Sequence, residues 1–180
     1  MKPKYLLFVL VASAALLATS CGKKKLKEYT VKNEYSISVP EDFVEQNLNP
    51  TRFSFGYGDK DDIVNIAEEG DPKVAYEERR TKDGKLAQYP YTLKGFSEFL
   101  VDDSKKNKGF RVISHKETII NGMPSVIDQM EYVIDNILFR LEVASVQSSD
   151  GKLYRIAVMS SKGKLPYAED VFASFKVLKQ

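Results

Sequence analysis

The chain has 180 residues, of which 43% are hydrophobic and 29% are charged, with a formal net charge of +2, one Cys and one His. This length and composition favour a single folded domain over a disordered chain. A single Cys and a single His exclude an internal disulfide framework, multi-Cys zinc or iron–sulfur sites and His-rich metal sites.

The first 20 residues have the features of a secretion signal. Lys2 and Lys4 form a short positive start, and residues 5–18 are apolar or small. As a helix this run spans about 21 Å, which is too short for a bilayer core of about 30 Å. The sequence therefore predicts a cleavable signal peptide over residues 1–20. Its two Lys account for the net charge, so the remaining chain is formally neutral.

The segment Leu17-Ala-Thr-Ser-Cys21 resembles a bacterial lipobox. The resemblance implies that Cys21 carries lipid and begins the mature protein, followed by a tether over residues 21–28. Ordinary signal cleavage, which leaves a free Cys, is the alternative. The Lys residues at positions 23–25 and 27 then lie near anionic head groups. Because this run is short and lacks interleaved aromatic residues, no nucleic-acid partner is expected.

Gly22 stands where enteric lipoproteins of the inner membrane carry a retention Asp, and no acidic surface-export tag follows it. If similar sorting applies, the resemblance implies a lipid-anchored protein of the cell envelope. Its expected location is the outer membrane, on the periplasmic side.

From residue 29 the pattern is typical of an α+β domain. Period-two alternation predicts strands near residues 29–31, 35–39, 52–57 and 63–67. A turn at Asn33-Glu34 joins the first two. The charged stretch over residues 68–91 follows, in which Val74–Arg79 fits either a short helix or a strand.

A helix over residues 92–106 is indicated by Thr92 at its N-cap and by an apolar face containing Phe96 and Leu100. Strands are then predicted at residues 110–120, 125–134, 137–146 and 153–160. They are joined by turns at Asn121-Gly122, at Asp135-Asn136 and over Ser148–Lys152. Asn-Gly suits the positive φ angles of a type I′ hairpin.

These hairpins predict an antiparallel meander with one buried face. That face is expected to carry Met130 and Tyr132, then Leu141 and Val143, and then Tyr154, Ile156 and Val158. A final helix near residues 166–174 is expected to pack toward this sheet.

The segment Tyr35-Ser-Ile-Ser-Val-Pro-Glu-Asp-Phe43 resembles the opening of PsbP-like domains, with Phe43 where Trp is common. Later segments are similar to that group in the same order: Phe96–Leu100, Ile120–Gly122, Gly151–Ile156 and Ser174–Val177. The resemblance covers nearly all of residues 29–180. It implies a Mog1/PsbP-like α/β/α sandwich, with a central antiparallel sheet and helices on both faces. The group includes bacterial lipoproteins, among them DcrB-like proteins, and the fold does not imply one function.

No pattern predicts a catalytic centre, a cofactor or a metal site. Asp59–Asp62 begins like a calcium loop but lacks the Gly and the Glu that such a loop requires. His115 is the one candidate base, and alternation places it on the face of Ile113 and Glu117. No nucleophile elbow accompanies it. A periplasmic hydrolase that uses His115 with a nearby carboxylate remains the alternative function, and weak metal binding by acidic loops is a third hypothesis.

Tyrosines and arginines gather just before the predicted helix, and both residue types are enriched in binding hot spots. The candidate partner-binding residues are Tyr76, Arg79, Arg80, Tyr89 and Tyr91. Alternatively, they seal the sheet edge and the start of the helix. The expected function is that of a non-enzymatic envelope lipoprotein whose domain binds a protein partner or a small ligand.

Overall fold

The structure, a computed structural model, describes residues 24–48, 54–68 and 89–178, which form two antiparallel sheets and two helices. The smaller sheet has the order β1-β2-β10, with β1 at Leu26–Val31, β2 at Tyr35–Pro40 and β10 at Lys176–Val177. The larger sheet has the order β3-β4-β5-β9-β8-β7-β6. Its strands are β3 (Val44–Glu45), β4 (Phe55–Gly58), β5 (Asp62–Glu68), β6 (Lys108–Ile120), β7 (Met123–Ile134), β8 (Ile137–Gln147) and β9 (Leu153–Ser160).

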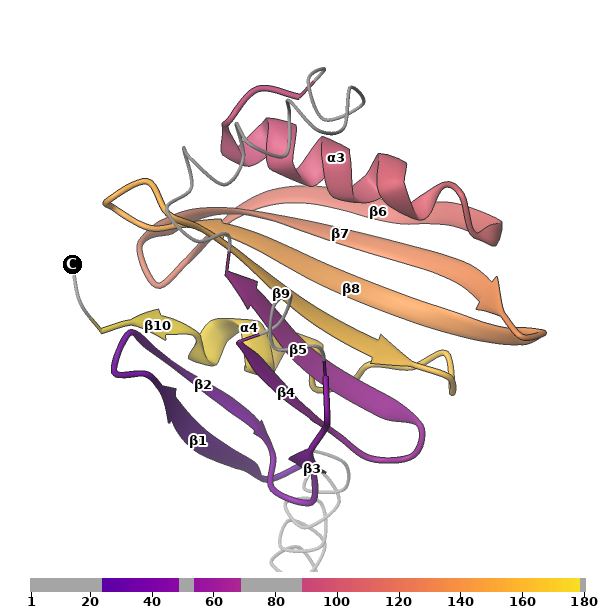
Figure 1. The fold of residues 1–180 in the computed structure, drawn as a ribbon, viewed down its shortest axis with the longest axis horizontal. Coiled ribbons are helices and arrows are strands. Elements are labelled where there is room, and N and C mark those ends of the chain that lie inside the picture. The colour runs from indigo at the N-terminus through magenta and orange to yellow at the C-terminus, as the bar shows by residue number, and fades with distance from the viewer. Residues whose placement is uncertain (1–23, 49–53, 69–88, 179–180) are drawn as a thin grey trace, which may run out of the picture.

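Both faces of the seven-stranded sheet are covered (Figure 1). Helix α3 (Leu93–Ser104) packs on one face, where Phe96 and Leu100 meet Met130 and Val143. Helix α4 (Ala168–Ser174) and the smaller sheet pack on the other face and form the larger core. The expected α+β architecture, with a central antiparallel sheet and helices on both of its faces, is confirmed.

Tight turns set the register of the meander as the sequence predicts. Asn121 and Gly122 have φ angles of 48° and 81°, and Ile120 pairs directly with Met123. The Asp135-Asn136 turn has φ angles of 50° and 64°. In the first hairpin, however, the positive φ angles fall at Lys32 and Asn33, one position earlier than expected.

The predicted single buried face is wrong for β9. Val143 pairs with Ala157, and both belong to the core beneath α3, whereas Ile156 pairs with Ala144 in the core on the opposite face. Tyr154 and Val158 share the face of Ile156. Strand β9 is apolar on both sides, because both faces of the sheet are covered at this position. Alternation therefore gives no indication of which set of its side chains faces α3.

Several boundaries differ from those expected. Strand β1 begins at Leu26, so residues 26–28 belong to the sheet and not to a tether. The two-residue strands β3 and β10 were not predicted. The start of the third expected strand and most of the stretch over residues 68–91 lie outside the described residues. Among the described residues, no helix is long and apolar enough to cross a membrane.

Candidate functional site

Helix α3 has a hollow on either side of it. The first, called here the α3–β6 groove, has a volume of about 330 Å³. The second, called here the β9 pocket, lies under the C-terminal end of the helix and has a volume of about 220 Å³. Thr92 begins the helix by accepting a hydrogen bond from the Gly95 backbone N–H at 3.1 Å. A Cβ atom at position 95 would lie 2.1 Å from the Pro90 carbonyl oxygen, so this close approach requires glycine.

Two elements face each other across the α3–β6 groove. Ser97, Val101 and Lys105 lie at four-residue intervals along α3, and Val112 and His115 come from β6. This interval places the three helical side chains on one face of the helix.

Tyr89 also lines the groove. Its ring packs edge-on against Phe99 with a centroid separation of 5.9 Å. Lys105 and Tyr89 both donate hydrogen bonds to the Asp102 carboxylate, and these bonds hold the pKa of Asp102 below its ordinary value. Tyr89 and Lys105 are thereby tied to the same helical carboxylate.

A chain of polar side chains runs from the core into the groove. Asp128 on β7 is 1% exposed, and the Ser97 hydroxyl, equally buried, donates to its Oδ2 atom at 2.6 Å. The Nδ1 atom of His115 lies 2.7 Å from Oδ1, and the imidazole side chain is 51% exposed. Both oxygens of the buried carboxylate are therefore paired, and the outer end of the chain is an imidazole that faces solvent.

A bulge in β6 brings His115 to this position. Val112 pairs with Met130 and His115 with Asp128, and the register shifts between Val112 and Ser114. Because of this shift, His115 shares the α3 face with Val112. The prediction that it shares a face with Ile113 is therefore wrong, because alternation from sequence assumes a regular strand.

This arrangement is not a serine-hydrolase triad. In such a triad the His lies between the Ser and the Asp and takes the Ser proton. Here Asp128 lies between Ser97 and His115, so the imidazole does not contact the Ser97 hydroxyl, which is itself buried. With Nδ1 on the carboxylate, the Nε2 atom of His115 is left to meet a ligand or a water molecule.

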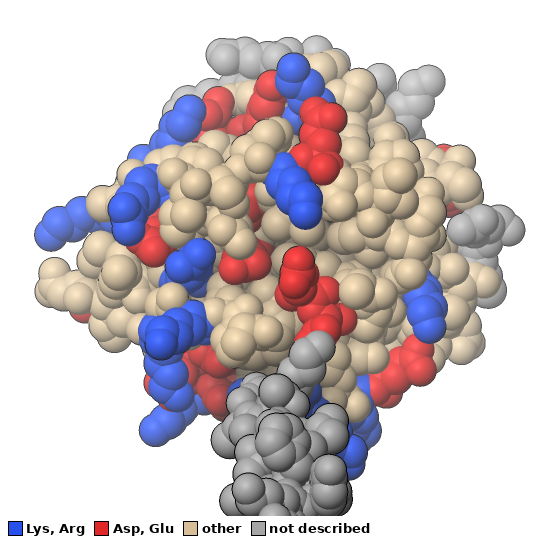
Figure 2. All heavy atoms as spheres, turned by 180° about the vertical axis from the view of Figure 1, so that it is seen from behind, with Lys and Arg blue, Asp and Glu red and all other residues tan. Residues whose placement is uncertain are grey.

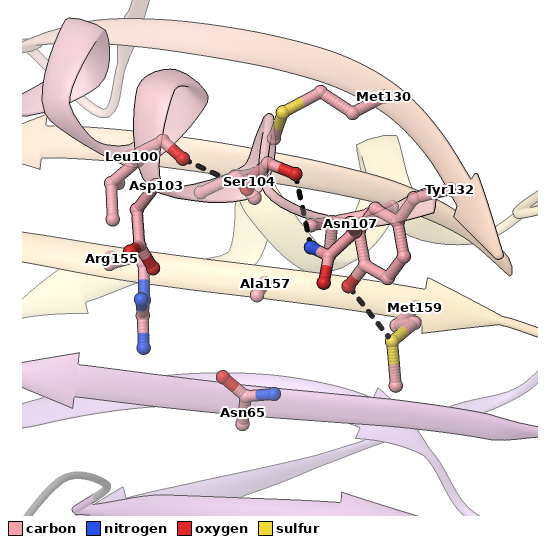
Figure 3. Close-up of a pocket in the computed structure, with 12 residues that line it drawn as sticks. Asn65, Leu100, Asp103, Ser104, Asn107, Met130, Tyr132, Arg155, Ala157 and Met159 are labelled. Atoms are coloured by element: carbon pink, nitrogen blue, oxygen red, sulfur yellow. Dashed lines mark hydrogen bonds between the residues drawn. The ribbon is translucent and has the colours of Figure 1, made fainter. Parts of the chain in front are cut away.

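The β9 pocket combines an apolar floor with polar groups (Figure 3). Met130, Tyr132 and Met159 contribute to the floor, and the Tyr132 hydroxyl donates to the Met159 sulfur at 3.6 Å. Burial raises the pKa of Tyr132. Asn65 on β5 contributes a buried Oδ1 atom with no hydrogen-bond partner. The pocket therefore suits a small ligand that has an apolar body and a hydrogen-bond donor.

The C-terminal end of α3 contributes polar side chains to the same pocket, namely Asp103, Ser104 and Asn107 (Figure 3). The Asn107 side-chain amide donates to the Ser104 carbonyl at 3.1 Å, which fixes the turn that follows the helix.

Of the lipidation and partner-binding candidates named from sequence, Tyr89 and Tyr91 lie within the described residues. Cys21, Tyr76, Arg79 and Arg80 lie outside the described residues. Tyr89 lines the groove, whereas Tyr91 is half-buried against the α3 core, with its hydroxyl 3.3 Å from the Gly151 carbonyl oxygen. This position of Tyr91 fits the alternative interpretation, in which it seals the start of the helix.

Ser97 and Asp128 were not recognised as site residues from sequence. A signal was available, because Asp128 alternates with the apolar Val126 and Met130 on a strand face predicted to be buried. A carboxylate at such a position needs partners, and buried, paired carboxylates are frequent in functional sites.

The acidic segment Asp59–Asp62 forms a turn. The Asp59 Oδ1 atom accepts the backbone N–H groups of Asp61 and Asp62, both at 2.8 Å. Across residues 24–48, 54–68 and 89–178, no three His, Cys, Asp or Glu side chains converge as metal ligands would. Figure 2 shows both cationic and anionic groups on the face seen from behind.

No model of a known protein family and no curated protein matches the chain. A solved structure that is similar is the solution structure of CyanoP, the cyanobacterial PsbP of Synechocystis sp. PCC 6803. The TM-score is 0.52 at 12% identity, over 88% of this chain and 95% of that chain. The chain therefore has a PsbP-like fold, as the sequence resemblance implies.

Two weaker similarities accompany it. LpqN, involved in cell envelope biogenesis of Mycobacterium tuberculosis, gives a TM-score of 0.49 at 13% identity, over 84% of this chain and 91% of that chain. PA94 of Pseudomonas aeruginosa, a protein of unknown function, gives 0.38 at 14% identity, over 81% and 89%. At 12% identity the likeness to CyanoP concerns the fold and not the activity.

Proposed function

We propose that this protein is a bacterial cell-envelope lipoprotein whose PsbP-like domain binds a protein partner or a small ligand and catalyses no reaction. Its anchor is lipid on Cys21, and its location is the outer membrane on the periplasmic side. The lipobox-like segment supports the anchor. The observation that carries the binding role is the Ser97–Asp128–His115 chain in the α3–β6 groove.

The argument rests on the cost of a buried carboxylate. Removing a carboxylate from water costs several kcal/mol unless hydrogen bonds compensate it, and an apolar residue at position 128 would pack without that cost. What the buried Asp128 adds is a fixed orientation for His115, whose outer edge faces the groove. Groups held in a fixed orientation lose little entropy on binding, so this arrangement favours recognition.

Site-specific photocrosslinking in native envelopes tests the proposal. A photoreactive phenylalanine at Val112, which lines the groove, should give a discrete crosslinked product. The same residue at Ile119, also exposed on β6 but outside the groove, should not. Asp128→Asn should reduce the Val112 product, whereas Lys94→Ala should leave it unchanged. Equal crosslinking from both positions, or no effect of Asp128→Asn, would contradict a groove-centred partner.

The anchor is tested separately. Mass spectrometry of the purified full-length protein should show diacylglycerol on Cys21, and Cys21→Ala should release the protein from the membrane fraction. An unmodified Cys21 thiol would overturn the lipoprotein assignment.

A second candidate function is a hydrolase, because Asp128 orients His115 as a carboxylate orients a general base. With Ser97 buried, the nucleophile would be water, whose proton would pass to the His115 Nε2 atom. A panel of ester, phosphate and peptide substrates tests this role. Turnover abolished by His115→Ala would establish it, and absence of turnover on the whole panel favours the binding role.

A further inference from the structure

Lys24, the first residue that the structure describes, is held by side chains from three other parts of the domain. Its Nζ atom lies 3.2 Å from Asp42 Oδ2 and 3.9 Å from Asp59 Oδ2. The same atom lies 4.6 Å from the centre of the Phe43 ring and 5.5 Å from that of the Tyr167 ring. Two carboxylates and two aromatic rings therefore surround one ammonium group, which is called here the Lys24 clamp.

The two rings of the Lys24 clamp are rigid. Phe43 and Tyr167 are each 3% exposed, and they pack edge-to-face with a centroid separation of 5.7 Å. A cation is attracted to the negative faces of buried aromatic rings, and the carboxylates add to this attraction. The clamp is thus a preformed site for a cation at this position of the chain.

The backbone next to Lys24 is also fixed. The Glu41 N–H donates to the Lys25 carbonyl oxygen at 2.9 Å, and Lys25 pairs with Glu41 at 2.9 Å. Strand β1 follows immediately at Leu26. Lys24 lies three positions after Cys21, and this length of chain spans at most about 10 Å. A lipid on Cys21 would therefore hold this end of the domain at the bilayer surface.

We propose that the Lys24 clamp docks the tether onto the domain, so that the protein stands on the membrane with its Phe43–Tyr167 end against the head groups and the α3–β6 groove turned away. This inference rests on the proposed lipid anchor. In Figure 1 the start of β1 and strand β3 lie at the bottom of the molecule, and α3 lies at the top. The α3–β6 groove then faces the aqueous compartment and not the bilayer.

Exposed lysines near the clamp suit a bilayer that contains anionic lipid. Lys60 and Lys162 lie on the loops that follow β4 and β9, and the Ser161 N–H joins these loops by donating to the Asp61 carbonyl at 3.0 Å. Lysines near an anionic membrane surface are attracted to it. Asp42, Asp59 and Asp61 balance these charges locally, so the lipid anchor and the clamp, and not charge alone, set the orientation.

Fluorescence quenching in proteoliposomes tests this orientation. The lipidated full-length protein is reconstituted in phosphatidylethanolamine–phosphatidylglycerol vesicles that contain a quencher on the lipid head group. An environment-sensitive fluorophore is placed at Lys60→Cys or at Lys94→Cys on α3, where it is the sole free thiol. Quenching at position 60 should exceed quenching at position 94 at least threefold. Lys24→Ala should reduce that ratio at least twofold.

Lys27→Ala is the matched control, because Lys27 lies on β1 with its ammonium 5.0 Å from the centre of the Tyr29 ring and makes no contact with the clamp. This variant should leave the ratio unchanged. Equal quenching at the two positions, or a ratio that Lys24→Ala does not change, would overturn the inference. Mass spectrometry of the same sample separates the two proposals. Lipid on Cys21 with equal quenching overturns the orientation alone, whereas an unmodified Cys21 overturns both.

Discussion

Substitution of Ser97 by Ala should destabilise the domain more than its small change in size suggests. The Ser97 hydroxyl donates to Asp128 at 2.6 Å, and both side chains are 1% exposed, so water cannot replace the lost donor. A hydrogen bond to a charged group contributes about 1.5–3 kcal/mol. The free energy of unfolding should therefore fall by about 2 kcal/mol. For a domain of this size that loss lowers Tm by about 4–8 °C.

His115→Ala should lower the free energy of unfolding by less, below about 1 kcal/mol. The imidazole is half-exposed, so water can take its place at Asp128 Oδ1. Ser114→Ala is the matched control. Its hydroxyl donates to Gln129 at 2.9 Å on the exposed surface, and its loss should cost less than about 0.5 kcal/mol. Urea unfolding at pH 7, followed by circular dichroism, measures all three variants. A Ser97→Ala cost no larger than that of Ser114→Ala would refute the reasoning, as would a His115→Ala cost larger than that of Ser97→Ala.

Further predictions concern a buried phenol and two glycines. Burial, followed by the nearby Asp62 and Asp59, raises the pKa of Tyr167 above its ordinary value of 10.0, so above pH 10 the unfolded chain loses a proton that the folded protein keeps. Between pH 10 and 11 the wild-type protein should therefore lose about 1 kcal/mol more stability than Tyr167→Phe, as measured by urea titration. An equal loss in both proteins would contradict this cause. Gly95→Ala should cost more than about 2 kcal/mol although alanine favours helices, because its Cβ would meet the Pro90 carbonyl. Gly122→Ala meets no atom within 4 Å and carries only the cost of its φ of +81°, about 1–2 kcal/mol. Thermal unfolding that ranks the two glycine variants in the opposite order would contradict this comparison.

Local signals in the sequence were sufficient to predict most of the meander formed by β6 to β9. Asn121-Gly122 and Asp135-Asn136 each define a two-residue turn, and such turns fix the register of both partner strands. Strand β9 has the predicted bounds. Strands β3 and β10 have two residues each and are held by pairing with β4 and β2, so no periodicity within them could reveal them.

The candidate site was predicted only in fragments. Tyr89 and His115 were singled out for separate hypotheses, and the structure brings both to the α3–β6 groove. Their meeting depends on the β6 bulge and on the packing of α3 over β7, and neither can be read from the spacing of residues. Asp128 was overlooked because its partners, Ser97 and His115, lie 31 and 13 positions away.

The pairing of β10 with β2 has a consequence for how the chain folds. The Ser38 N–H donates to the Ser174 hydroxyl oxygen across 136 positions, and Phe175, which is fully buried, packs against Tyr35 and Tyr154. The strand that follows Phe175 completes the small sheet begun by β1 and β2. A nascent chain ending before residue 175 therefore lacks both the third strand and a central core side chain. During synthesis from the N-terminus, the earliest strands of the domain would therefore reach their native packing only after almost the whole chain has been made.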